Sequence, residues 1–149
     1  MKKIALTLFA FCLLFQSPAM AQEDIKTKYD DGLTVVTLGH YTDDLHAAFM
    51  AFKIASKLEE KGEDVVIFLN LEAVRIADKQ QPLDMAWGHN ADFSSLYRAF
   101  LDNGGEILVC PHCAKSAGID ADTLRPDMVI AKEGQIVDLI AFADKVVSY

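Results

Sequence analysis

Apolar residues along this chain follow two alternating patterns. Short runs of four to six mostly apolar residues, often β-branched, predict buried strands, and longer stretches with apolar residues at helical spacing predict helices. The predicted strands are 33–38, 64–69, 106–109, 127–131 and 145–149. The predicted helices are 45–61, 71–78, 92–102, 110–118 and 135–143. Because strands and helices alternate, the sequence predicts an α/β fold with a mostly parallel sheet of about five strands, covered on both faces.

The loops that follow the strands are the places to look for a site. In a parallel sheet, ligands bind outside the carboxyl ends of the strands. Three segments follow predicted strands directly: 39–42, the long irregular stretch 70–90, and 110–113. We therefore expect these segments to meet at one edge of the sheet, where they would form the candidate site.

The N-terminal 21 residues have the three parts of a secretory signal peptide. Two lysines follow Met1, residues 4–15 are almost entirely apolar, and Ala19-Met20-Ala21 is a small-x-small cleavage site. The apolar run is too short to span a bilayer. We predict cleavage after Ala21, a periplasmic or secreted protein, and no membrane anchor after cleavage.

Cleavage changes the composition of the chain. It leaves 128 of 149 residues, a length typical of one domain with a single core. Residues 22–31 are polar and predict a flexible lead-in, and 32–149 predict the α/β domain. The net charge becomes more negative, from −8 to −10, because Lys2 and Lys3 are removed with no acid. Such an acidic surface argues against nucleic acid and anionic lipid as partners.

The remaining cysteines are Cys110 and Cys113, in the segment Cys-Pro-His-Cys. An exported compartment is oxidising, so a structural disulfide is chemically possible. A bridge across two intervening residues, however, closes a very small loop and restrains little of the unfolded chain. We therefore interpret the pair as functional.

The position of Cys110 favours sulfur chemistry. It lies where a strand runs into a helix, and the unpaired N–H groups of a helix start favour a thiolate there. Pro111 suits the first helical turn, and a protonated His112 would add to the stabilisation. Cys113 follows one turn later. We predict that Cys110 is the attacking sulfur and that Cys113 resolves a mixed disulfide or shares a sulfur.

The same tetrapeptide occurs in thioredoxin-like periplasmic disulfide oxidants, but its position argues against that fold. In thioredoxin-like proteins the cysteine pair follows an early strand, and a cis-proline loop, two strands and a helix come later. Here only 36 residues follow Cys113, and their one proline, Pro126, leaves no room for that second half.

From residue 33 to residue 149 the chain resembles the DsrE/DsrF-like family of sulfur-relay proteins. The resemblance rests on the apolar strand 65–69, the turn 103–105, the segment 108–119 around the cysteines, and the ending 142–147. It implies a three-layer α/β/α fold, ring-like oligomers, and a persulfide on the cysteine eight residues before a glycine. That cysteine maps onto Cys110, with Gly118 as the glycine.

Two features of this chain differ from that family pattern. Many members have arginine before the glycine, where this chain has Ala117, so an anion-steering role there is not carried over. The well-understood relay proteins are cytoplasmic and serve tRNA thiolation, whereas this chain begins with an export signal. Its sulfur donor and acceptor, a protein or a small thiol, are therefore expected to be different ones.

The four histidines give weaker signals. His40 and His89, with Trp87, lie in loops at the predicted site edge and are candidate pocket residues, whereas His46 lies on a predicted helix and suits a surface or packing role. One Cys-x-x-Cys pair with scattered histidines matches a closed zinc site poorly, and thiolates would favour copper(I) if any metal bound. We expect no metal and no cofactor.

Three functions follow from the sequence. The first is an exported homo-oligomer that binds or transfers sulfane sulfur as a persulfide on Cys110. The second is a thiol–disulfide oxidoreductase that uses the Cys110/Cys113 pair. The third is a non-enzymatic binding module.

Overall fold

The computed structural model describes residues 28–29, 32–89 and 92–149, and the predicted signal peptide lies outside them. Five parallel strands form one sheet in the order β4-β3-β2-β1-β5. Their bounds are β1 Leu33–Leu38, β2 Asp64–Leu69, β3 Glu106–Val109, β4 Val129–Ile130 and β5 Lys145–Ser148. The predicted parallel sheet is confirmed, although β4 is shorter than the predicted 127–131.

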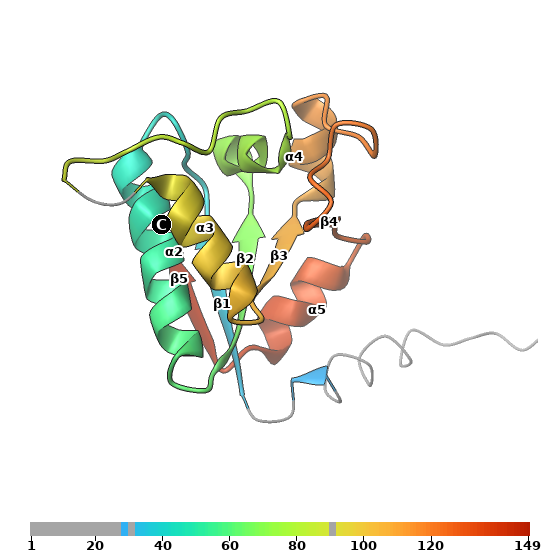
Figure 1. Ribbon diagram of the computed structural model, residues 1–149. Helices are drawn as coiled ribbons and strands as arrows, with labels where there is room; N and C mark the ends of the chain where they lie inside the picture. Colours follow the sequence, from blue (N-terminus) through green and yellow to red (C-terminus); the bar gives the residue numbers. More distant parts are fainter. Residues whose placement is uncertain (1–27, 30–31, 90–91) are drawn as a thin grey trace, which may run out of the picture.

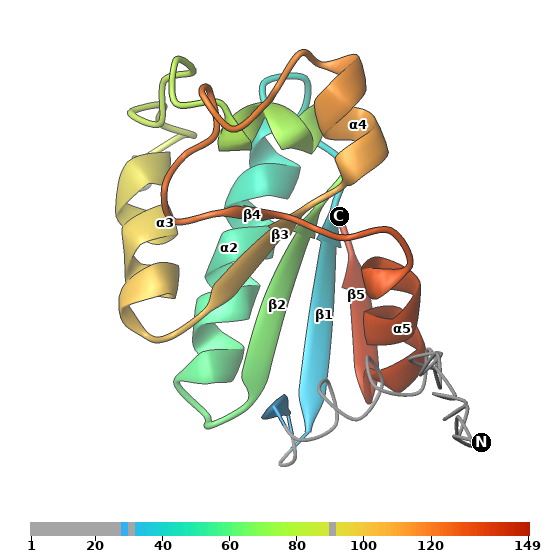
Figure 2. The same ribbon diagram turned by 90° about the vertical axis from the view of Figure 1, so that its right-hand side faces the viewer.

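Helices cover both faces of this sheet. Their bounds are α2 Leu45–Glu59, the 3-10 helix η1 Leu71–Ala77, α3 Phe93–Asp102, α4 Pro111–Ser116 and α5 Gln135–Phe142. Figures 1 and 2 show α2 and α3 on one face and α5 on the other. The short helices η1 and α4 lie beyond the carboxyl ends of the strands, where they pack against each other. The three-layer α/β/α fold is thereby confirmed.

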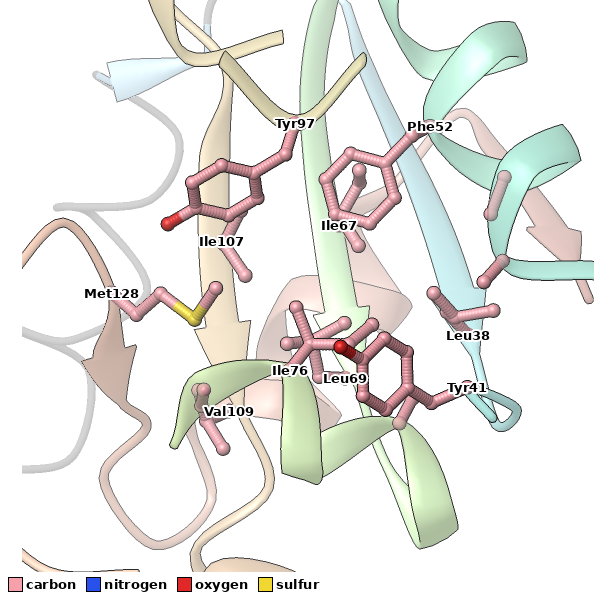
Figure 3. Close-up of a cluster of buried hydrophobic side chains, with 14 of the residues drawn as sticks. Leu38, Tyr41, Phe52, Ile67, Leu69, Ile76, Tyr97, Ile107, Val109 and Met128 are labelled. Carbon is pink, nitrogen blue, oxygen red and sulfur yellow. The ribbon is translucent and has the colours of Figure 1, made fainter. Parts of the chain in front are cut away.

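The larger part of the core lies between the sheet and the α2/α3 layer. Because successive strand residues point to opposite faces, alternate residues of β2 and β3, such as Ile67, Leu69, Ile107 and Val109, face this layer. Phe52 of α2 meets Phe93, Tyr97 and Phe100 of α3 at ring-centroid distances of 4.9–6.0 Å. Figure 3 shows Tyr97 and Phe52 over the strands, with Ile76 of η1 closing the carboxyl end.

The opposite face carries a thinner core. Leu33, Val35 and Phe68 pack there under Leu139 of α5. Tyr29 joins them although it belongs to the segment predicted to be a flexible lead-in. Its ring is buried on the sheet, and the neighbouring Lys28 pairs with Glu106 at 2.6 Å. Burial of the Tyr29 ring and the ion pair of Lys28 place these two residues against the sheet.

Side chains from elsewhere in the chain donate hydrogen bonds to backbone carbonyls of η1 and of the stretch that follows it. The Arg125 guanidinium donates to the carbonyl oxygens of Ile76 and Gln81, at 2.7 and 2.5 Å. The Tyr41 hydroxyl donates to the carbonyl of Pro82. These contacts fix η1 relative to the sheet, and so they position one wall of the site described below. Within the part of the chain that the structure describes, no helix has the length and apolar character needed to cross a membrane.

Candidate thiol site at the carboxyl end of the sheet

Cys110 is held at the junction of β3 and α4. Its backbone N–H donates to the carbonyl of Leu69 at 2.9 Å, which extends the β2–β3 pairing by one residue. Its carbonyl accepts from the N–H of Ala114, and its sulfur accepts from the N–H of Cys113 at 3.4 Å. The cysteine therefore caps α4 with its own side chain, and Pro111 starts the helix without losing a donor.

The two sulfurs have different surroundings. Both cysteines are free and half-buried. Burial raises the pKa of the Cys113 thiol, and its hydrogen bond with the Cys110 sulfur acts in the same direction. The backbone N–H of Leu71 also reaches Cys113 and partly offsets both effects. Cys113 therefore keeps its proton at neutral pH.

A groove of about 220 Å³ opens beside Cys113, between η1 and α4. Each helix contributes one face to it. The lining residues are Leu71, Glu72, Val74 and Arg75 from η1, and His112, Cys113, Ser116 and Ala117 from α4 and its end. Cys110 does not line the groove, so a molecule that enters it meets Cys113 first. Figure 2 shows η1, in green, beside α4, in orange.

The η1 wall combines an ion pair with exposed apolar surface. The Nε of Arg75 donates to Glu72 at 2.8 Å, and both side chains are about half exposed. Leu71 is 68% exposed although it is a large apolar residue. It also has a φ of 45°, in the left-handed region that a leucine seldom adopts. This conformation turns the chain from β2 into η1 and brings the Leu71 N–H to Cys113.

The sequence reasoning did not find the η1 side of the groove. Glu72 and Arg75 are three residues apart on a helix, a spacing that also occurs in ordinary surface ion pairs. The sequence predicted a short helix over 71–78, but not which face of it would meet α4. The pairing of η1 with a helix about 40 residues later is a tertiary contact that no local pattern records.

The other predicted pocket residues lie apart from the groove. His40 is exposed and pairs with Asp43 at 2.6 Å, and this hydrogen bond raises the pKa of His40. Trp87 stacks on His46, with ring centroids 3.8 Å apart and planes at 6°. His89 is exposed, and none of these residues lines the groove. Of the predicted site residues, the groove brings together Cys113 and His112.

No metal cluster accompanies these side chains. Among the described residues, no group of three or more His, Cys, Asp or Glu side chains is arranged to hold a metal ion.

Comparison with known proteins identifies the family. The model of the DsrE/DsrF-like family matches residues 33–149, which is most of the chain. The chain belongs to the DsrE/DsrF-like family. A search of curated proteins finds no match.

Solved structures agree with the DsrE-like fold. The YchN protein from E. coli is 19% identical, with a TM-score of 0.65, and the match covers 79% of this chain and 98% of YchN. MTH1491 from Methanobacterium thermoautotrophicum, a protein of unknown function, is 16% identical with a TM-score of 0.57, covering 80% and 100%. BT1422 from Bacteroides thetaiotaomicron, also of unknown function, is 14% identical with a TM-score of 0.59, covering 81% and 97%. At these identities the likeness establishes the fold alone.

Proposed function

We propose that this DsrE-like protein carries sulfane sulfur as a persulfide on Cys110. The observation that carries the proposal is the unequal environment of the two sulfurs. Cys110 stands at the N-cap of α4, where its sulfur accepts a hydrogen bond from the backbone N–H of Cys113 at 3.4 Å, whereas burial raises the pKa of the Cys113 thiol. Membership of the DsrE/DsrF-like family supports the same assignment, because the resemblance of the segment around the cysteines implies that the sulfur-carrying cysteine is the one eight residues before Gly118, which is Cys110.

The loading step moves one sulfur atom without a net change of oxidation state. The Cys110 thiolate attacks the outer sulfur of a persulfide donor R–S–SH, the donor's S–S bond breaks, and R–S⁻ leaves. The product is Cys110–S–SH. Cys113 keeps its proton, and its backbone N–H donates to the sulfur of Cys110.

Mass spectrometry of the reduced protein after treatment with a sulfane-sulfur donor tests this proposal. We expect one added sulfur in the wild type, none in Cys110→Ser, and retained uptake in Cys113→Ser, which serves as the matched control. Uptake by Cys110→Ser equal to that of the wild type would refute the assignment.

A second candidate, a thiol–disulfide oxidoreductase, is favoured by one specific observation. The backbone N–H of Cys113 donates to the Cys110 sulfur at 3.4 Å, which places the two cysteines in contact, so a bond between their sulfurs needs only small adjustments. In this function the dithiol loses two electrons and two protons to a disulfide substrate, which is reduced to two thiols. Loss of either cysteine then abolishes multiple turnover, whereas the sulfur carrier still loads without Cys113. Turnover of a disulfide substrate, followed in both single variants, separates the two functions.

We also propose that the protein acts as an exported homo-oligomer. The signal-peptide pattern in residues 1–21 supports export. Exposed apolar side chains on the α5 side of the sheet, Val137, Ile140 and Val146, support self-association, since such patches mark interaction surfaces. Light scattering of the wild type and of Val137→Asp tests the oligomer, and we expect the charged variant to dissociate. An unchanged mass for Val137→Asp would remove this surface from the interface.

A further inference from the structure

We propose that the groove between η1 and α4 is the acceptor site for a small zwitterionic aminothiol of cysteine size, which takes the sulfur from the protein. This inference rests on the proposed function, because it names the acceptor of the same sulfur. Three properties of the groove carry it: its position, its charge and its size.

The position of the groove makes Cys113 the exit for sulfur. Cys113 lines the groove, and its backbone N–H donates to the Cys110 sulfur at 3.4 Å, so the two cysteines are in direct contact. A sulfur carried by Cys110 can therefore reach the groove through Cys113. The Leu71 N–H beside Cys113 acts against the rise in the pKa of the Cys113 thiol.

The charges on the groove wall match a zwitterion better than an anion. Arg75 uses its Nε for Glu72, which leaves its two terminal nitrogens as donors for a carboxylate. Glu72 contributes a carboxylate that an ammonium group can approach. Because the pair is close to neutral and the chain carries a net charge of −8, a dianion such as thiosulfate gains little here. An α-amino acid presents one group to each partner.

The size and the apolar wall restrict the ligand further. A volume of about 220 Å³ lies below the roughly 300–1,000 Å³ typical of sites for drug-sized ligands. Leu71 and Val74 supply apolar surface for a methylene group. These dimensions suit a thiol of amino-acid size and leave little room for a folded protein domain to enter.

The sulfur passes from Cys110 to the acceptor in two steps. The sulfur of Cys113 attacks the outer sulfur of Cys110–S–SH, the S–S bond breaks, and the Cys113 proton passes to Cys110. The thiolate of the aminothiol then attacks the outer sulfur on Cys113, and the Cys113 sulfur leaves and takes up the proton that the acceptor released. The products are an aminothiol persulfide and the protein dithiol, with no net oxidation.

Binding can be tested independently of sulfur loading. S-methyl-L-cysteine has the same charged groups but a blocked thiol, so it binds without reacting. We expect saturable NMR shifts at the amides of Glu72, Arg75 and Ser116, weaker binding of the D-isomer, and about tenfold weaker binding to Arg75→Gln and Glu72→Gln, since each change removes one charged partner of the ligand and tenfold in Kd corresponds to about 1.4 kcal/mol. Arg98→Gln, a change on the exposed side of α3, is the matched control.

Discharge of the loaded protein tests the chemistry. Wild-type protein carrying one added sulfur is treated with L-cysteine or D-cysteine, whose thiols are chemically identical, and loss of the sulfur is followed by mass spectrometry. We expect saturation and a faster reaction with the L-isomer, a raised half-saturation concentration in Arg75→Gln, and slow discharge in Cys113→Ser. Equal, unsaturated rates for both isomers together with no S-methyl-L-cysteine binding would overturn the acceptor site and leave the persulfide on Cys110 standing. Failure to load at all, with binding intact, would instead overturn the proposed function.

Discussion

The two ends of the sheet hold unusual side chains for different reasons. At the carboxyl end, the free thiol of Cys113, an exposed leucine in a left-handed conformation and an ion pair line an open groove. At the amino end, Glu59 is pressed against the backbone of Gly105, and one of its carboxylate oxygens is buried without a hydrogen-bond partner among the described residues. The carboxyl end keeps a reactive thiol accessible, whereas close packing at the amino end encloses the Glu59 carboxylate.

The amino end is a packing junction. A Cβ atom placed on Gly105 would lie 2.3 Å from the Phe100 ring and 2.4 Å from Glu59. Phe100 is fully buried and meets Phe52 edge-on, so it has little freedom to move. Burial raises the pKa of Glu59 to about 7, and the nearby Asp64 adds to the shift. The comparison therefore predicts that changes at the amino end alter stability, whereas changes at the carboxyl end alter sulfur chemistry.

The largest expected effect is the opposite behaviour of Phe100→Ala and Cys110→Ser. Phe100→Ala removes a fully buried ring and should lower the free energy of unfolding by about 3–5 kcal/mol. Its folded fraction should still load sulfur. Cys110→Ser keeps a small capping side chain and should change stability by less than about 1 kcal/mol, yet abolish loading. Urea unfolding and mass spectrometry on both variants check this, and a stable but inactive Phe100→Ala would show that the two ends of the sheet do not have separate roles.

Gly105→Ala should have the next largest effect. The added methyl group overlaps Phe100 and Glu59, and overpacking of this kind costs about 1–3 kcal/mol. The matched control is Gly62→Ala. Gly62 has no atom near the added Cβ but a φ of 86°, so it reports backbone strain alone. Thermal unfolding should show a larger loss for Gly105→Ala, and an equal loss in both would mean that strain rather than packing explains Gly105.

Prediction from sequence succeeded where the signal was local. The β-branched runs gave correct strands, and Cys110 with Pro111 marked the start of α4. The groove could not be predicted, because it depends on the left-handed turn at Leu71 and on η1 meeting α4 across the sheet edge. The same limit applies to Gly105, whose close contact with Glu59 joins the end of α2 to the residue before β3, far apart in sequence. Local patterns do not report such contacts.

Glu59→Gln should change stability less than Gly105→Ala does, and its effect should depend on pH with a defined sign. Its pKa is raised to about 7 in the folded protein, so the protonated form is favoured by folding. This contribution to stability is fully present below the unfolded pKa, near 4.5, and is lost as pH rises through 7. Glu59→Gln should therefore match the wild type in acid and exceed its melting temperature by a few degrees at about pH 8. Glu60→Gln, which loses an exposed ion pair with Lys57, is the control, and its melting temperature should not rise above that of the wild type at about pH 8.

The smallest expected effect concerns His40, a polar residue at the carboxyl end that stands outside the groove. Its hydrogen bond with Asp43 raises the pKa of His40, so the imidazole stays charged to a higher pH than usual, and Asp43→Asn should lower that pKa. NMR titration of the His40 ring measures the shift. Both side chains are exposed, so unfolding should change little. The rate of sulfur loading should also stay the same in Asp43→Asn at every pH. If the loading rate instead followed the titration of His40, the thiol site would extend from the groove to the loop after β1. Residues at the carboxyl edge of the sheet would then influence sulfur loading even when they do not line the groove.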